Sequence, residues 1–237
     1  MAEEKDKKGP KGGKPSAEEI ARKKAAKKAK VEVAAEEEGD EASQTPAPPP
    51  RLIAHYRDTV APALKQRFGY TNNLAVPRLE KIVISMGVGK YAVAGGEGKA
   101  KIDRVEQELT QIAGQKPQRC KAKKAVANFK VREGMETGLK VTLRGTRMYE
   151  FLDRMITLAI PRVKDFRGLN PNAFDQDGNF NFGFAEQTVF PEVDAATVTF
   201  QQGMNITMVT TAKSIKEGRE LLRQFGVPFK TDVKEKD

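Results

Sequence analysis

Apolar residues recur with two different spacings along the larger, C-terminal part of the chain. From residue 52 to residue 68 every fourth residue is apolar, which predicts one helix with a buried stripe that ends near Gly69. From Ile82 to Val88 large apolar residues occupy alternate positions, the pattern of a half-buried strand. The helical spacing then returns and predicts a second helix that stops at Gly114.

The same two spacings continue after residue 138. Apolar residues alternate from Leu139 to Leu143, so Lys140, Thr142 and Arg144 are predicted to face outward from a strand. A third helix follows, with an inward face made of Met148, Phe151, Leu152, Met155 and Leu158.

The last part of the chain contains one long loop and one clear helix signal. Residues 165–184, rich in Gly, Asn and Phe, are predicted to form a loop that leads into a strand, and residues 197–213 a strand, a turn and a strand. Ser214 followed by Glu217 is the capping box of a final helix. Because no strand has the continuous apolar run of a buried parallel sheet, the sequence predicts an α+β domain with one polar, open sheet face.

Residues 1–50 differ from the rest in composition. A Lys-rich block is followed by an acidic block and by prolines at positions 46 and 48–50, with almost no large apolar residue. Such a segment cannot bury enough surface to offset its ordering entropy. The sequence therefore predicts a disordered charged tail with a Pro-rich linker and a possible transient helix from Ser16 to Val33, followed by one globular domain over residues 51–237. The tail either solubilises the protein or folds onto RNA or a protein partner.

The net charge of +10 lies entirely in the predicted domain. Residues 1–50 hold 11 basic and 11 acidic side chains, whereas residues 51–237 hold 31 and 21. Such a surplus indicates a polyanionic partner, either nucleic acid or an anionic membrane. A membrane is disfavoured because no amphipathic helix places aromatic residues beside the lysines. With no apolar signal or membrane-spanning run, the simplest expectation is a cytoplasmic protein.

The composition leaves little room for metal or acid–base chemistry. One cysteine, Cys120, and one histidine, His55, cannot form a disulfide or a zinc site with four ligands, and no nucleophile and base stand together. We expect no metal and no cofactor. His55 is expected to be structural or exposed, and Cys120 to be a small packing residue.

The segment "GVGKYAVAGGEGKA" raises the alternative of a nucleotide-dependent enzyme. Its GK pairs have neither the first glycine nor the Ser or Thr of a phosphate-binding loop. Gly87 and Gly89 match a dinucleotide-binding pattern loosely, but no helix is expected to open directly from them. Glycines that let a strand end and turn are the favoured interpretation, and calorimetry with nucleotides would separate the two.

The stretch Gly114–Gly134 carries the densest one-signed charge. No acidic residue lies between Thr110 and Arg132, and amide side chains are interspersed among the cations. The cations are Lys116, Arg119, Lys121, Lys123, Lys124, Lys130 and Arg132. A solvated face is the plain explanation. Because the next strand adds Lys140, Arg144 and Arg147, a basic platform for RNA phosphates and 2′-hydroxyls is favoured.

Several long blocks resemble one known family. They are "VPRLEKIVISMGVG", "IAGQKPQRCKAKKAVANFKVREG", "GLKVTLRGTRMYEFLDRMITLAIPRVKDFRGL", and the segment from "EQTVFPEVD" through "ITMVTTAKSIKEGRELLRQFGVPF". In order and spacing, over about residues 52–230, they are similar to the bacterial ribosomal protein L5 family of the large subunit. The resemblance implies a twisted, mainly antiparallel sheet with helices packed on one face, an open RNA-binding face and long loops.

The resemblance also implies partners and a non-enzymatic role. Family members bind 5S ribosomal RNA, help attach it to 23S ribosomal RNA in the central protuberance beside other 5S-binding proteins, and contact P-site tRNA. They form an intersubunit bridge to the small-subunit head protein S13. A free RNA chaperone of the same fold is the alternative, and its sedimentation would not follow ribosomes.

The resemblance and the charge pattern together assign three groups of residues. Residues expected to bind ribosomal RNA are Arg78, Lys81, Ser85, Gln115, Lys116, Arg119, Lys121, Lys123, Thr142, Arg144 and Arg147. The loop facing tRNA contains Lys124, Asn128, Lys130 and Arg132. The bridge region contains Arg162, Lys164 and Arg167.

Three positions depart from the family pattern, and one loop carries a dynamic expectation. Ser85 stands where an asparagine is usual, Ala185 where a basic residue is usual, and Glu136 is expected near the polyanion at a loop tip. The loop from Lys124 to Gly138 is expected to be mobile in the free protein, with Gly134 and Gly138 as hinges.

Overall fold

A computed structural model describes residues 48–230. The predictions for the tail, including the possible helix from Ser16 to Val33, lie outside the described residues. Among residues 48–230 no helix is both long and apolar enough to cross a membrane.

The first helical segment runs without a break and confirms the predicted helix. It consists of α2 (Arg51–His55), a π-helical turn (Tyr56–Val60) and α3 (Ala61–Phe68). Gly69 ends it in the left-handed conformation, with φ 70°. The predicted stripe is buried in part, with Leu52, Val60 and Leu64 in the core.

Five strands form one sheet in the order β2-β3-β1-β5-β4, and every neighbouring pair is antiparallel. The strands are β1 (Leu79–Gly87), β2 (Gln118–Lys121), β3 (Glu136–Leu143), β4 (Phe180–Phe184) and β5 (Met204–Thr210). The predicted α+β class is therefore confirmed.

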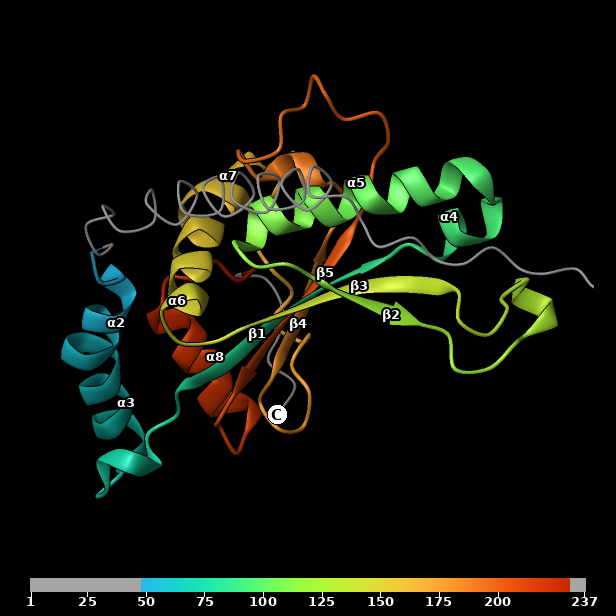
Figure 1. Cartoon of the computed structure of the whole chain (residues 1–237). Coiled ribbons are helices and arrows are strands. Elements are labelled where there is room, and N and C mark those ends of the chain that lie inside the picture. The colour runs from blue at the N-terminus through green and yellow to red at the C-terminus, as the bar shows by residue number, and fades with distance from the viewer. Residues whose placement is uncertain (1–47, 231–237) are drawn as a thin grey trace, which may run out of the picture. The chain divides into compact units, whose positions relative to one another are not determined.

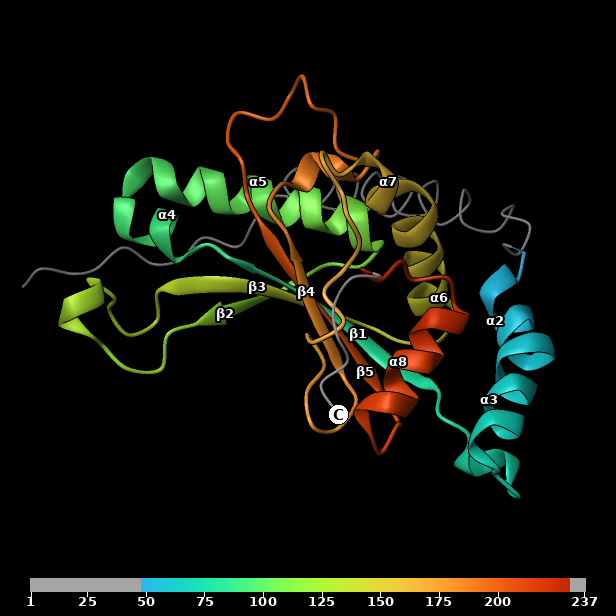
Figure 2. The same cartoon turned by 180° about the vertical axis from the view of Figure 1, so that it is seen from behind.

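The remaining helices pack mainly against one face of this sheet. They are α4 (Gly89–Ala94), α5 (Gly96–Ala113), α6 (Gly145–Arg154), which continues through a π-helical turn into α7 (Ile160–Arg162), and α8 (Ile215–Gln224). Figures 1 and 2 show α5 and α6 along one side of the strands, with α2 and α3 outside α6 and α8.

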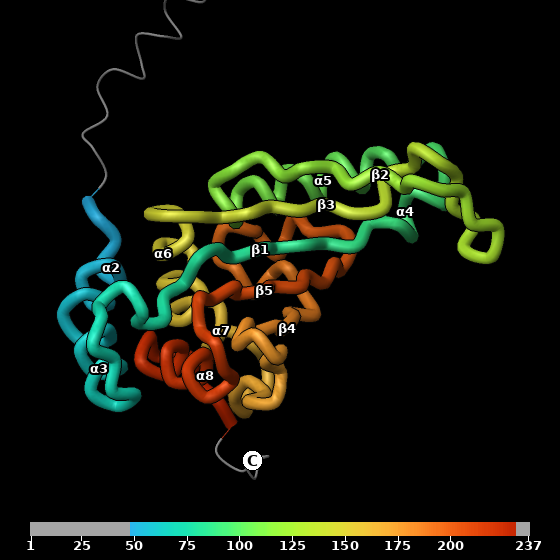
Figure 3. Tube along the Cα trace, turned by 90° about the horizontal axis from the view of Figure 1, so that it is seen from below, coloured from blue at the N-terminus to red at the C-terminus, as the bar shows by residue number. Residues whose placement is uncertain are grey.

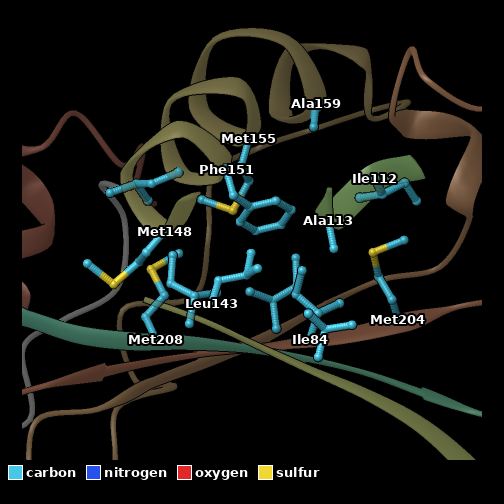
Figure 4. Close-up of a cluster of buried hydrophobic side chains, with 14 of the residues drawn as sticks. Ile84, Ile112, Ala113, Leu143, Met148, Phe151, Met155, Ala159, Met204 and Met208 are labelled. Atoms are coloured by element: carbon cyan, nitrogen blue, oxygen red, sulfur yellow. The ribbon is translucent and has the colours of Figure 1, made fainter. Parts of the chain in front are cut away.

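The core lies between the sheet and these helices. Ile84 of β1 pairs with Val141 of β3 and with Ile206 of β5, and all three side chains point toward the helices and are buried. Figure 4 shows Met148, Phe151 and Met155 descending onto this layer. Because side chains alternate along each strand, the sheet has an apolar inner face and a largely polar outer face.

One predicted core position is wrong. Leu158 is 46% exposed, whereas the neighbouring Ala159 is fully buried. The cause is the π-helical turn Met155–Ala159, because its wider turn shifts the buried stripe by one residue.

Of the two strands predicted within residues 197–213, only the second forms, as β5, so the prediction of the first is wrong. The buried side chain of Gln187 explains the difference. Its amide donates to the Phe200 carbonyl at 2.8 Å, and its oxygen accepts from the Gln202 backbone N–H at 2.6 Å. The backbone is thereby bonded to a side chain instead of to a neighbouring strand.

The glycine-rich segment after β1 forms two helices, which corrects the expectation that no helix opens there. α4 begins at Gly89, and Gly95, with φ 79°, turns the chain into α5. A side chain at Gly98 would collide with the Tyr91 carbonyl oxygen. Gly95 and Gly98 therefore allow two helices to turn and pack closely, and the all-antiparallel sheet contains no βαβ unit.

Candidate nucleic-acid interface

The outer face of the sheet carries rows of polar side chains. Ser85 of β1 pairs with Lys140 of β3 and with Asn205 of β5, so these three side chains stand side by side. In the next row Val83 stands between Thr142 and Thr207. We call this surface the open face; Figure 3 views the sheet from the side opposite to α5.

The edge strands extend both rows. Gln118 of β2 lies opposite Lys140, and Asn181 of β4 lies opposite Thr207, whose hydroxyl donates to the Asn181 side-chain oxygen at 2.7 Å. Between β1, β5 and β4 lies a shallow hollow of about 430 Å³. Its lining comprises Ser85, Asn181, Phe182, Asn205, Ile206 and Thr207.

Apart from Val83, the side chains of the two rows are amides, hydroxyls and one lysine, Lys140, and none of them is acidic. Amides and hydroxyls can donate to phosphate oxygens and exchange hydrogen bonds with 2′-hydroxyls, while lysines neutralise phosphates. The shallow, wide minor groove of RNA presents both kinds of group. The open face is therefore chemically suited to an RNA backbone.

The structure brings together only some of the residues that the sequence assigned to ribosomal RNA. Lys81, Ser85 and Thr142 lie on the open face, and Lys81 also pairs with Glu80 at 3.4 Å. Arg144 follows β3 with an extended backbone (φ −139°, ψ 162°), which continues the outward alternation. These four positions form a continuous part of the site.

The other assigned positions lie around the sheet. Arg147 is exposed on α6, which covers the opposite face, so it does not share the predicted platform. Arg78 is exposed just before β1, and the turn between α5 and β2 holds half-buried Gln115 and exposed Lys116. Three polar residues of the rows were missed by sequence reasoning, namely Asn181, Asn205 and Thr207. Their alternation with apolar residues in β4 and β5 was the available signal.

Arg119 points to the helix side of the sheet and corrects the expectation that it belongs to the open platform. It pairs with Leu139, whose side chain is in the core. Its guanidinium donates to Asp103 at 2.7 Å and to Glu106, both on α5, and to Glu136 of β3 at 3.1 Å. These carboxylates raise its pKa further above the ordinary range. Arg119 thus joins α5 to two strands.

The same cluster changes the expected role of Glu136. This residue is half-buried in β3 and bonded to Arg119, so its charge is matched within the fold. The structure places it at the base of the long hairpin and not at the tip. Ser85 presents its hydroxyl on the open face, and Ala185 is exposed directly after β4.

Residues 122–135 connect β2 to β3 as a projecting hairpin, which we call the arm (Figure 1). Its predicted tRNA-facing residues, Lys124, Asn128, Lys130 and Arg132, are all exposed. The Ala122 N–H donates to the Met135 carbonyl at 2.8 Å, which closes the neck.

Only one of the two expected hinges fits this geometry. Gly134 adopts φ 81° at the neck. Gly138 pairs with Gly87 and with Cys120 within the sheet, so the expectation that it acts as a hinge is wrong.

The predicted bridge residues Arg162, Lys164 and Arg167 are exposed at the end of α7 and in the loop after it. Further along this loop, Pro171 and Gln176 help line a groove of about 760 Å³ between α3 and α8. The groove is also lined by Arg67, Lys213, Lys216, Arg219 and Arg223. This side of the molecule is therefore basic as well.

The single histidine and cysteine have structural surroundings. His55 lies 3.1 Å from the Gln224 carbonyl oxygen through its Nε2 atom, which joins α2 to the end of α8. Cys120 is a free, half-buried thiol within β2. Both placements agree with the structural roles expected from the sequence.

Comparison with known proteins decides what kind of protein carries this face. Residues 72–132 match the family model of ribosomal protein L5, and residues 136–229 match the model of the C-terminus of the same ribosomal family. The chain belongs to the ribosomal protein L5 family. Members of this family are structural components of the large ribosomal subunit and not enzymes, so the nucleotide-dependent alternative is set aside.

Individual members of the family are similar in sequence to this chain over most of its length. Large ribosomal subunit protein uL5 of Alkaliphilus metalliredigens is 53% identical over 179 residues, 76% of this chain and 98% of the relative. The protein of the same name from Rubrobacter xylanophilus is 52% identical over 180 residues (76% and 98%), and that of Thermosipho africanus 55% over 179 residues (76% and 97%). The relatives are thus covered almost completely, while about a quarter of this chain remains unmatched.

Proposed function

We propose that this chain binds 5S ribosomal RNA through the open face and helps attach it to 23S ribosomal RNA in the central protuberance of the large subunit. The observation that carries the proposal is the acid-free pair of polar rows centred on Ser85 and Val83. A sheet face that only had to be soluble would mix both signs of charge. Membership of the L5 family supplies the ribosomal RNA as the polyanion.

The charges around the open face set a quantitative expectation. Six exposed or half-exposed cations are candidates for contact with ribosomal RNA, namely Lys81, Lys116, Lys121, Lys123, Lys140 and Arg144. Of these, Lys81, Lys140 and Arg144 lie on the open face. If about five of them neutralise phosphates, the slope of log K against log salt concentration for 5S RNA is about −4. A slope near zero contradicts the proposal.

A matched pair of charge variants tests the location of the interface. Lys140→Gln removes a cation from the open face, and Lys99→Gln removes an equally exposed cation from α5 on the helix side. The first change reduces the salt slope by about one, and the second leaves it unchanged. Equal effects of both variants would place the RNA elsewhere.

The polar rows are tested separately from the charges. Asn205→Ala removes an exposed amide that the fold does not need, because its side chain points away from the core. Affinity for 5S RNA falls at every salt concentration, while the slope stays the same. A change in slope without a change in affinity at low salt would contradict an amide contact.

We further propose that the arm meets P-site tRNA and that the region of Arg162, Lys164 and Arg167 meets small-subunit protein S13. The support is the exposure of every cation assigned to these two regions and the resemblance to the L5 family. Cross-linking from Lys164 within intact ribosomes tests the bridge. Cross-links to large-subunit components alone would contradict it.

A further inference from the structure

The arm displays an apolar side chain at its tip. Phe129 is 75% exposed, and it is the one aromatic residue among the large hydrophobic side chains exposed within residues 48–230. Exposing a phenylalanine forfeits the hydrophobic stabilisation that burial would provide. The arm has no core of its own against which this ring could fold, since residues 123–130 are all exposed.

The backbone holds this ring outward in a defined turn. Val126 and Val131 exchange two hydrogen bonds, from the Val126 N–H at 2.9 Å and from the Val131 N–H at 3.1 Å. Between them the chain forms one 3₁₀ turn, Ala127–Phe129, closed by the Lys130 N–H on the Ala127 carbonyl at 3.0 Å. Lys130 has φ 55°, a conformation unusual for a lysine. The tip is thus a closed turn with Phe129 at its apex.

The charges around the ring select the class of partner. The arm carries Lys123, Lys124, Lys130 and Arg132 against a single acid, Glu133. No ion pair within residues 48–230 involves any of the four cations. An aromatic ring surrounded by unpaired cations is the arrangement used to bind RNA where a base is free to stack. An apolar protein partner would not require this charge.

We propose that Phe129 stacks on an unstacked base of the RNA that the arm meets, while the neighbouring cations hold the phosphates on either side. The inference rests on the proposed contact between the arm and P-site tRNA. It adds a division of labour within the tip: the cations supply attraction that salt weakens, and the ring supplies a contact that salt does not weaken.

Three substitutions at one position test the ring. Phe129→Ala removes it, Phe129→Leu keeps an apolar side chain without a π face, and Phe129→Trp keeps an aromatic face. Each is measured in complete ribosomes that contain the full-length variant, as the dissociation rate of deacylated tRNA from the P site at two salt concentrations. Since Phe129 lies outside the core, thermal unfolding and 5S RNA affinity of the free variants serve as controls for folding.

Stacking predicts that Phe129→Ala and Phe129→Leu both accelerate tRNA dissociation by about tenfold, with an unchanged salt dependence, and that Phe129→Trp restores the original rate. If Phe129→Leu behaves as the unaltered protein, the ring makes an ordinary apolar contact, as with a protein neighbour, and the proposal is overturned. It is overturned equally if all three variants release tRNA at the original rate.

A charge variant separates this inference from the proposed function beneath it. Replacement of Lys124, Lys130 and Arg132 by alanine removes three arm cations and leaves the ring. If this variant accelerates dissociation and the Phe129 variants do not, the arm meets tRNA but the ring does not stack. If neither accelerates dissociation, the contact between the arm and tRNA is itself wrong.

Discussion

Arg119 illustrates how one residue within a basic stretch can have a role different from that of its neighbours. Lys121 and Lys123 are exposed, whereas Arg119 lies on the helix side of β2 with three carboxylates around it. A guanidinium can serve several carboxylates at once because its donors point in fixed, divergent directions. Its removal would leave three acids facing one another.

We therefore expect Arg119→Met to destabilise the fold. The pairs are only partly shielded from solvent, so the loss should be about 2 kcal/mol, below the cost of breaking a fully buried pair. Lys121→Met, which removes an exposed cation two residues away, is the matched control and should change the free energy of unfolding by less than about 0.5 kcal/mol. Urea denaturation of the free protein measures both. Equal stability of the two variants would show that the cluster is not structural.

Residue by residue, the sequence predicted burial better than it predicted contacts. Ile84, Leu139 and Val141 were assigned to the core correctly because strand alternation depends only on the strand itself. The partners of Arg119 lie 13 to 17 residues away, on a helix and on another strand. Charge pattern alone could not distinguish it from the lysines, because its neutralising acids lie outside the stretch.

At the scale of elements, the arm is an extension of the β2–β3 pair. The Arg119 cluster lies at its base, the Ala122–Met135 hydrogen bond closes its neck, and the Val126–Val131 pair closes its tip. The prediction of a hinge at Gly138 was wrong because Gly138 pairs with Gly87 within the sheet. Only long-range pairing, which the sequence does not display, fixes where β3 begins.

The arm should affect tRNA more than 5S RNA. Replacing Lys124, Lys130 and Arg132 by alanine should remove the three phosphate contacts proposed for the arm, at about 0.5 kcal/mol each, and tRNA dissociation from the P site should therefore accelerate about tenfold. Affinity for free 5S RNA should fall only slightly, because the open face is intact. Filter binding and tRNA release from complete ribosomes measure the two effects. A collapse of 5S binding with unchanged tRNA release would reverse the proposed roles.

Tyr70 connects the end of α3 to α8, and its hydroxyl group titrates at high pH. Tyr70, just after α3, donates a hydrogen bond to Glu217 of α8, and burial together with this bond raises the pKa of Tyr70 to about 12. The folded state therefore holds this proton more tightly than the unfolded chain does. The stabilisation is complete below pH 10 and is lost as the pH rises from about 10 to 12.

Tyr70→Phe tests that link. Below pH 10 the variant should be less stable by about 1 kcal/mol, because the hydrogen bond to Glu217 is lost. Between pH 10 and 12 the difference from the unaltered protein should shrink, since phenylalanine has no proton to lose. Urea denaturation of both proteins at pH 8 and at pH 11 measures this difference in the free energy of unfolding. A difference that is the same at both values would contradict the assigned pKa.

At the scale of the whole described domain, the two faces of the sheet have different roles. Its inner face, packed by α5, α6 and α8, forms the core, and its outer face carries rows of amides and hydroxyls together with Lys140. The α+β class and the open face could be predicted from the sequence, because alternating apolar and polar residues indicate strands with one buried and one solvent-exposed face. The order β2-β3-β1-β5-β4 did not follow, so the row from Gln118 to Asn205 could be recognised only in three dimensions.

The most direct test of the central claim maps which side of the sheet touches 5S RNA. The Cys120→Ser substitution first removes the only native cysteine. A single cysteine is then introduced elsewhere, and a reagent that generates hydroxyl radicals is attached to it. Asn205→Cys places it on the open face, and Gln107→Cys on the exposed side of α5. The account predicts focused cleavage of 5S RNA from position 205 and little from position 107. Cleavage from position 107 with none from position 205 would contradict it.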